Sequence, residues 1–163
     1  MKTAYNIITF ALLFLISCTS EPPLDSHKAD ATAETFRADE WPQKWQLVEM
    51  SGNIANIPPQ RAKEMEWQEY YVLFEDGSFT KDREWSQLPK RSKGTYQISV
   101  NEHGKYIEFK HDSANNLVGA CIQGPAETLA ITSENKLVGT WLMCDGPGLL
   151  YERVEYDVSK DGL

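Results

Sequence analysis

Short runs of aromatic and β-branched residues recur from Trp41 onward, and turn signals separate them about every 8 to 15 residues. The run at 95–100 shows the pattern most clearly, because three apolar residues alternate with three polar ones. Successive side chains of a strand point to opposite faces of a sheet, so this run predicts a half-buried strand. Asp76-Gly77 predicts a tight hairpin, since glycine accepts positive φ. This spacing favours an antiparallel sandwich or barrel over βαβ units.

The domain is therefore expected to be all-β, a small antiparallel up-and-down barrel of about eight or nine strands. The expected strands cover residues 45–50, 68–74, 78–83, 95–100, 106–110, 117–122, 127–132, 137–143 and 149–156. A polar stretch at 58–66 has room for one short helix, and 85–93 is expected to be a loop that carries Pro89. Closure into a barrel removes exposed sheet edges and leaves an interior wide enough for one small ligand.

The first residues form a short apolar run behind one positive charge. Lys2 precedes the run at 7–16, which is shorter than the roughly 20 residues that a membrane-spanning helix needs. This is the layout of a secretory signal. The segment 15–18, Leu-Ile-Ser-Cys, resembles the lipobox of bacterial lipoproteins. The resemblance implies cleavage after Ser17, lipid on Cys18 and a stable membrane anchor, because several acyl chains on one residue hold a protein firmly.

These features divide the chain into four parts. They are an expected signal peptide at 1–17, a lipidated cysteine and disordered tether at 18–40, a barrel domain at 41–157 and a tail at 158–163. The tether contains a Pro pair, small residues and charges, with little to bury. Thr19 follows Cys18, where an Asp would favour retention in the inner membrane in families with sorting rules. The outer membrane of a bacterial cell envelope is therefore the expected location.

Charge and cysteine content narrow the class further. The formal net charge is −8. This argues against nucleic acid and against a polybasic membrane-binding surface, since both need clustered Lys and Arg. Apart from Cys18, Cys121 and Cys144 remain, and we expect them to form a disulfide in an oxidising compartment, worth roughly 3 kcal/mol. No His or further Cys lies at zinc-ligand spacing from either residue, so no metal is expected.

Four short segments occur in an order that resembles a known family. They are Trp45-Gln46-Leu47-Val48, Phe74-Glu75-Asp76-Gly77-Ser78-Phe79, Gly94-Thr95-Tyr96 and Tyr151-Glu152-Arg153-Val154. Together they resemble the small lipocalin-like lipoprotein domains of the Bacteroidetes, over residues 41–157. The resemblance implies an up-and-down barrel and, by analogy, an apolar ligand in its mouth.

The domain is rich in aromatic residues, which suggests either a lined cavity or plain barrel core. The residues expected to line a cavity or its mouth are Trp45, Trp67, Tyr70, Trp85, Tyr96, Trp141 and Arg153. Trp85 is the least expected to be core, because it falls in a polar loop. Arg153 shares a strand with Tyr151 and is expected to point inward and form an ion pair within the barrel.

The sequence gives no sign of a catalytic centre or a cofactor, so no enzymatic activity is expected. It contains neither Gly-x-Ser-x-Gly nor a phosphate loop. Several histidines and carboxylates are expected to be solvated surface groups, namely His27, His103, His111, Glu64, Glu66, Glu69 and Asp76. Asp112-Ser113-Ala114 resembles the O-glycosylation signal of exported Bacteroidetes proteins, which makes Ser113 a candidate acceptor.

Two functions from different classes fit these observations. The first is a binding module that takes a small apolar molecule into the barrel, and it predicts a cavity of several hundred Å³ with apolar lining. The second is a protein-interaction or inhibitor module with a solid barrel whose loops dock on another protein. Lysozyme-inhibitor lipoproteins have a comparable plan of anchor, small barrel and disulfide, and a negative net charge suits a basic enzyme.

Overall fold

The computed structural model describes residues 41–52, 57–85 and 88–161. The expected signal peptide and tether, with Cys18 and His27, lie outside the described residues, and the expectations for them stay predictions. Within the described ranges, no helix is both long and apolar enough to cross a membrane. The α-helix found there, α2 (Val158–Asp161), is short and falls in the expected tail.

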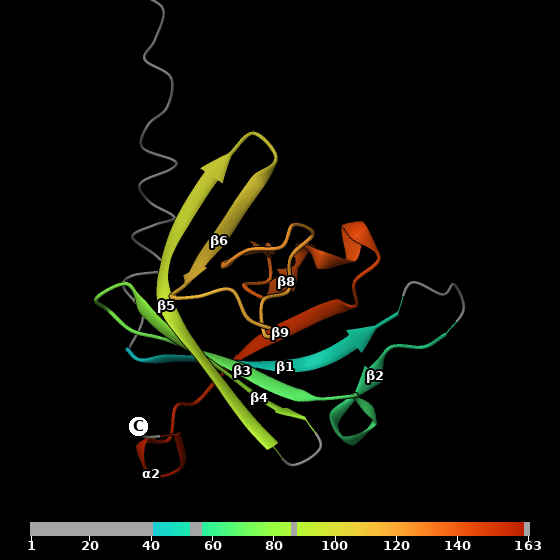
Figure 1. Cartoon of the computed structure of the whole chain (residues 1–163), viewed down its shortest axis with the longest axis horizontal. Coiled ribbons are helices and arrows are strands. Elements are labelled where there is room, and N and C mark those ends of the chain that lie inside the picture. The colour runs from blue at the N-terminus through green and yellow to red at the C-terminus, as the bar shows by residue number, and fades with distance from the viewer. Residues whose placement is uncertain (1–40, 53–56, 86–87, 162–163) are drawn as a thin grey trace, which may run out of the picture.

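The described strands form one antiparallel sheet that closes into a barrel (Figure 1). The strands are β1 (Gln43–Ser51), β2 (Gln60–Arg61), β3 (Gln68–Leu73), β4 (Ser78–Trp85), β5 (Leu88–Asn101), β6 (Gly104–His111), β7 (Ala126–Ile131), β8 (Leu137–Gly139) and β9 (Gly148–Val154). From β3 to β9 each strand pairs with the next along the chain, and β1 pairs with both β3 and β9 to close an eight-stranded ring. β2 pairs with β1 outside the ring. The predicted all-β barrel is confirmed.

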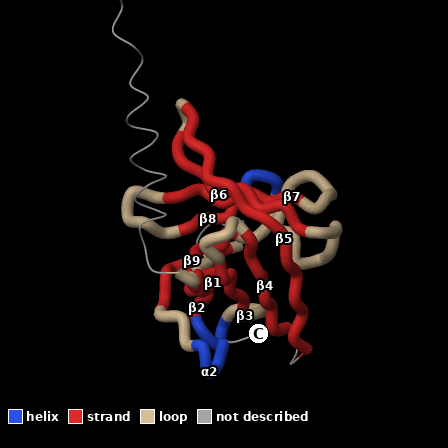
Figure 2. The backbone as a smooth tube through the Cα atoms, turned by 90° about the vertical axis from the view of Figure 1, so that its left-hand side faces the viewer, coloured by secondary structure: helices blue, strands red, loops and turns tan. Residues whose placement is uncertain are grey.

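β5 is the longest strand and joins two parts of the barrel. It pairs with β4 from Leu88 to Thr95 and with β6 from Gly94 to Asn101. The pairings overlap at Gly94 and Thr95, and a Cβ at Gly94 would lie 2.0 Å from the carbonyl oxygen of Lys110. Glycine is therefore required where β5 passes from one neighbour to the other. Figure 2 shows β5 beside β4 over its first part and beside β6 over its second.

The prediction of a loop at 85–93 is wrong for residues 85 and 88–93, which the structure describes as strand. Trp85 ends β4, and Leu88 to Lys93 begin β5 and pair with β4 in register. The side chains of Arg91 and Asp82 lie opposite each other and form an ion pair at 2.7 Å. The polar sequence of this segment suits a two-stranded ribbon that extends from the barrel, where few side chains need to be apolar.

Three other expected elements are shorter than predicted or absent. Residues 117–122 are a loop and not a strand, and the carbonyl oxygen of Leu117 accepts a hydrogen bond from Lys81 instead of from a neighbouring strand. The strand expected at 137–143 ends at Gly139, and η2 (Thr140–Cys144), a 3-10 helix, follows it. The helix expected at 58–66 is reduced to β2 and the 3-10 turn η1 (Ala62–Glu64).

Aromatic rings fill the centre of the barrel. Tyr71 stacks on Phe109 with 4.6 Å between ring centroids and meets the edge of Tyr151 at 5.3 Å. Phe79 packs edge-on against Phe109 at 4.7 Å. These four residues and Trp45 are each at most 1% exposed. Their contacts form a ring core inside the barrel, as the alternation along the strands predicts.

Candidate functional site

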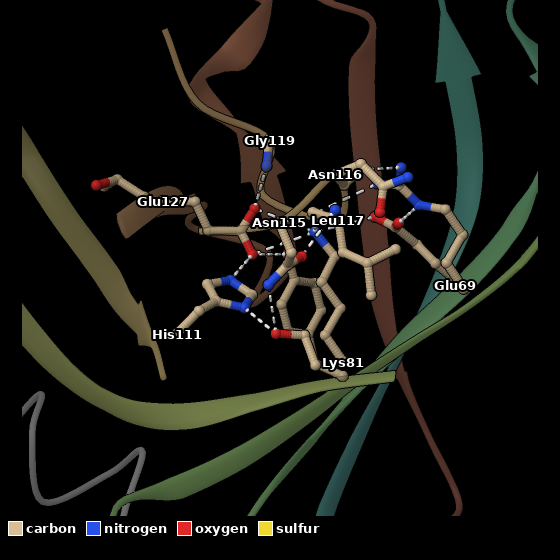
Figure 3. A network of polar contacts seen from close by, with 12 residues as sticks. Glu69, Lys81, His111, Asn115, Asn116, Leu117, Gly119 and Glu127 are labelled. Carbon is tan, nitrogen blue, oxygen red and sulfur yellow. Dashed lines mark hydrogen bonds and ion pairs between the residues drawn. The ribbon is translucent and has the colours of Figure 1, made fainter. Parts of the chain in front are cut away.

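Ionisable side chains lie together inside the barrel (Figure 3). Two of them contact the ring core, since His111 packs against Phe79 and Lys81 lies over the ring of Tyr71. This buried charge cluster consists of Glu69 on β3, Lys81 and Arg83 on β4, His111 on β6 and Glu127 on β7. Each residue is at most 6% exposed. Strand alternation brings them inward, since Lys81 follows Phe79 by two residues and His111 follows Phe109 by two. A buried charge is costly unless it is paired, so the contacts of the cluster determine whether it is stable.

Glu127 accepts hydrogen bonds on both carboxylate oxygens. Its Oε1 accepts from the Tyr71 hydroxyl at 2.7 Å and lies 2.9 Å from His111 Nε2. Its Oε2 accepts from the Gly119 N–H at 2.6 Å. The Lys81 Nζ lies 3.1 Å from both oxygens. This many donors, one of them cationic, stabilise the ionised carboxylate in the interior.

Glu69 is held by the second cation of the cluster. Its Oε2 accepts from Arg83 Nε at 2.5 Å, and its Oε1 accepts from the Tyr151 hydroxyl. Lys81 Nζ lies 3.6 Å from the same Oε1, so Lys81 stands between the two buried carboxylates. The charges of Glu69 and Glu127 are therefore matched by those of Lys81 and Arg83 within the barrel.

This environment shifts the pKa of three groups. Burial by itself would raise the pKa of Glu127, but the charge of Lys81 and the hydrogen bond from His111 outweigh it and lower the pKa to about 2. Burial raises the pKa of the Tyr71 and Tyr151 hydroxyls well above 10, and the neighbouring carboxylates raise both further. Both phenols therefore remain protonated hydrogen-bond donors at neutral pH.

We expect acid to weaken the fold through Glu127. Its folded pKa of about 2 lies below its ordinary value of 4.5, so its contribution is complete above pH 4.5 and is lost as the pH falls from there toward 2. The shift corresponds to about 3 kcal/mol. Urea unfolding of wild type and Glu127→Gln at a series of pH values measures it. The difference in unfolding free energy between wild type and Glu127→Gln should become smaller as the pH falls from 4.5 toward 2. A difference that stays constant would contradict the expectation.

The buried charge cluster also holds the loop at 112–125, which connects β6 to β7. Lys81 Nζ donates to the carbonyl oxygen of Leu117 at 2.6 Å, and Arg83 donates to that of Asn116 at 3.1 Å. Backbone carbonyls that face the barrel interior thus receive donors from charged side chains, which are strong hydrogen bonds. The loop is positioned by the cluster and not by strand pairing.

The predicted disulfide between Cys121 and Cys144 is confirmed. The bond joins a loop to a 3-10 helix and does not link two strands. Cys121 lies in the loop at 112–125 and Cys144 ends η2, and both residues are exposed. The loop is therefore held at two places, by the buried charge cluster from inside and by the disulfide from outside.

A chain of hydrogen bonds runs from β5 into the cluster. Ser92 Oγ lies 2.7 Å from His111 Nδ1, and His111 Nε2 lies 2.9 Å from Glu127. With the ring proton assigned to Nε2 from these partners, this is the order of groups in a serine hydrolase triad. Two contacts weigh against a nucleophile: Asn115 already donates to Ser92 Oγ at 2.9 Å, and Lys81 neutralises the carboxylate that would stabilise an imidazolium. We interpret this series of hydrogen bonds as a structural link between strands.

Two residues that are expected at the surface lie in the interior of the barrel. His111 and Glu69 are 2% and 0% exposed, so that expectation was wrong for both. The missed signal was the alternation itself, because His111 continues the inward series of Phe109 and Glu69 precedes Tyr71 by two residues. Four other groups are exposed as predicted, namely Glu64, Glu66, Asp76 and His103.

Three of the tryptophans expected to line a ligand site differ in their surroundings. Trp45 belongs to the ring core. Trp67 is also buried, and the Arg83 guanidinium lies 4.5 Å from the centre of its ring. Trp85 is 44% exposed, and its ring centroid lies 6.5 Å from that of Trp67. Trp85 is therefore the exception to core packing that the sequence predicts.

The other expected lining residues are equally dispersed. Tyr70 is half-buried, with Lys44 Nζ 4.3 Å from the centre of its ring. Tyr96 and Trp141 are half-buried against the edge of the core. Arg153 is exposed, so its expected place in an interior ion pair was wrong, and Arg83 fills that role with Glu69.

Among the clefts of the described surface, one adjoins Ser113 and another adjoins the aromatic residues Trp41 and Tyr96. The first, which we call the basic cleft, has a volume of about 460 Å³ and lies between residues 90–93 of β5 and residues 112–117 of the loop. Ser113, the candidate glycosylation site, is exposed on its rim. The second measures about 500 Å³ and is lined by Trp41, Tyr96, Ile98 and neighbouring residues. In the described part of the chain, no group of three or more His, Cys, Asp or Glu is arranged to hold a metal ion.

Comparison with known proteins adds no relative to this description. No protein-family model, no curated protein and no solved structure matches the chain. The resemblance to lipocalin-like lipoprotein domains thus rests on the sequence segments given above and stays a prediction.

Proposed function

We propose that the chain is a lipid-anchored lipoprotein of the bacterial cell envelope whose barrel is a non-catalytic module that binds another protein through its outer surface. The signal-like run and Cys18 support the location. The Cys121–Cys144 disulfide supports it too, because such bonds persist in oxidising compartments outside the cytosol. Binding through the outer surface is supported by one observation, namely that the ring core and the buried charge cluster fill the interior of the barrel.

An apolar ligand in the barrel would have to displace groups that are already paired. Tyr71 belongs to the stacked ring core and also donates to Glu127. Lys81 and Glu127 would lose hydrogen bonds beside such a ligand, and unpaired buried charges cost several kcal/mol. Of the two functions that the sequence suggests, the geometry therefore favours the protein-interaction module, in which a solid barrel binds a partner through its outer surface.

Photo-crosslinking tests this binding role in cells that carry the lipidated chain. A crosslinking residue is placed at outward positions in different elements, such as Thr95 on β5, Glu108 on β6 and Lys136 in the turn before β8. We expect a discrete crosslinked protein from some of these positions and not from others, since a specific interface covers one patch. The absence of any crosslinked protein from every outward position would overturn the proposal.

A small-ligand role remains a second candidate, because the cleft beside Trp41, Tyr96 and Ile98 has a volume of about 500 Å³ and two aromatic walls. Native mass spectrometry of the full chain before and after organic extraction tests it. A mass excess that extraction removes and that Ile98→Asp abolishes would support this candidate. A clean mass, unchanged after incubation with fatty acids, would exclude it and leave the protein-binding role.

The anchor gives a separate prediction. We expect the wild-type chain to fractionate with membranes in a Gram-negative host, and we expect Cys18→Ala to move to the soluble fraction, because the anchor is covalent lipid. Mass spectrometry of the mature amino terminus should show acyl groups on Cys18. The variant Cys121→Ser/Cys144→Ser serves as the matched control and should stay with the membrane. An unmodified Cys18 in a membrane-bound wild-type chain would contradict the prediction.

A further inference from the structure

The first part of β5 is paired on one side only. Leu88 to Lys93 pair with β4, whereas β6 begins to pair with β5 at Gly94. Within the residues that the structure describes, no strand pairs with the other side of 88–93. The Asp112 N–H donates to the carbonyl oxygen of Lys93 at 2.9 Å and marks the end of this open edge. An unpaired edge of this kind can accept another strand.

Strand alternation shows which peptide groups face the open edge. The Tyr96 N–H donates to Gly77 on the β4 side, and the Lys93 carbonyl accepts from Asp112 on the opposite side. Backbone groups of successive residues point to opposite sides of a strand. The N–H and carbonyl oxygen of Arg91 therefore face the open edge, into the basic cleft.

The open edge is strongly basic in a chain whose net charge is −8. Lys90, Arg91 and Lys93 line the basic cleft. Arg91 pairs with Asp82 at 2.7 Å across the β4–β5 ribbon, and the Lys93 Nζ lies 4.0 Å from Asp112. Exposed pairs at such distances contribute little, so the positive charges can still interact with an anionic partner.

We propose that the open edge of β5 in the basic cleft binds an extended acidic peptide of a partner protein as an added strand. The backbone of Arg91 supplies main-chain hydrogen bonds, and Lys90 and Lys93 attract carboxylates of the peptide. Main-chain bonds give affinity in such strand addition, and alternate side chains give specificity. The edge is long enough for a strand of about five residues.

Lysines and prolines on sheet edges commonly prevent aggregation, and Pro89 with Lys90 and Lys93 fits that role. The two roles are compatible, because like charges repel a second copy of the same edge while acidic segments are attracted. The basic cleft adds a feature that edge protection does not require, namely a polar wall from residues 112–117 facing the edge.

The inference rests on the proposed protein-binding role and names the chemistry of the partner. The purified full-length chain is tested by fluorescence anisotropy with a labelled peptide that alternates Thr and Glu. Comparison peptides carry Lys in place of Glu, or the same Thr and Glu residues with N-methylated backbone amides. We expect the Glu peptide to bind at least about tenfold more tightly than either comparison peptide, and more weakly at high salt.

Variants locate the site on the chain. Lys90→Glu/Lys93→Glu should abolish binding of the Glu peptide, whereas Lys63→Glu/Lys105→Glu makes the same charge change on exposed residues elsewhere and should leave it intact. Amide hydrogen exchange should show new protection of the Arg91 N–H in the complex. Equal binding of the N-methylated peptide, or equal loss in both variants, would overturn strand addition at this edge.

Failure of this inference is distinguishable from failure of the proposed function. A chain that crosslinks a partner from other outward positions but binds no Glu peptide would retain the function and lose this site. A chain that binds the Glu peptide at β5 but sits in the envelope without lipid on Cys18 would retain the site and lose the anchor.

Discussion

Replacement of Lys81 by Met should lower the free energy of unfolding by about 3 to 5 kcal/mol, because it removes a cation from between two buried carboxylates. The Lys81 Nζ lies 3.1 Å from both oxygens of Glu127 and 3.6 Å from Glu69 Oε1. Met is similar in length and flexible, so it fills most of the same space and isolates the effect of the charge. Urea unfolding at neutral pH measures the loss.

The matched control is Lys136→Met at the surface. Lys136 Nζ pairs with Glu152 at 2.9 Å, but both side chains are partly exposed, so the loss of unfolding free energy should be far smaller than in Lys81→Met. The double variant Lys81→Met/Glu127→Gln should recover part of the loss, since it removes both partners of the buried pair. A loss in Lys81→Met no larger than that in Lys136→Met would show that the buried charge cluster contributes little to stability.

The barrel itself was predictable because its signals are local. Gly77 has a φ of 82°, as the Asp76-Gly77 hairpin requires. The alternation at 106–110 placed the inward residues Ile107 and Phe109 of β6 correctly. The alternation at 95–100 held only in part, because Tyr96 and Ile98 pack against the core whereas Val100 is 42% exposed. The pairing of Cys121 with Cys144 also followed from the cysteine count, given lipid on Cys18 and an oxidising compartment. Each of these features depends on a few neighbouring residues or on a count.

The buried charge cluster was not predicted, because its partners are distant in sequence. The Tyr71 hydroxyl meets Glu127, which lies 56 residues later, and Lys81 meets it from 46 residues away. The charge of a single residue in a strand predicts an outward side chain. Only its separation in sequence from the inward residues of the same strand shows that the side chain points inward. For His111 and Glu69 the alternation predicts an inward side chain, whereas the polarity of the residue predicts an outward one.

Pro89 explains the other main error. A proline within a polar run favoured a loop, yet the residue lies in β5. By the alternation that directs Arg91 to the open edge, the nitrogen of Pro89 also faces that edge, where no ladder hydrogen bond is lost. Proline is tolerated in edge strands for this reason. The sequence therefore contained a sign of an unpaired edge, and only the topology shows where that edge lies.

Removal of the disulfide by Cys121→Ser/Cys144→Ser should lower the free energy of unfolding by about 3 kcal/mol, because the cysteines are 23 residues apart and their bond limits the unfolded chain. Urea unfolding measures the change, and reduction of the wild-type protein should reproduce it. Wild type and double variant of equal stability under oxidising conditions would contradict the prediction.

The loss of the disulfide in Cys121→Ser/Cys144→Ser should change amide exchange in one part of the loop at 112–125 and not in another. The Gly119 N–H donates to Glu127 at 2.6 Å and the Leu117 carbonyl accepts from Lys81 at 2.6 Å, and neither bond depends on the disulfide. Amide exchange should therefore accelerate at 121–124 and stay slow at Gly119. Equal acceleration at both places would mean that the disulfide alone positions the loop. Because residues 112–117 precede the cysteine and form one wall of the basic cleft, the variant should still bind the Glu peptide.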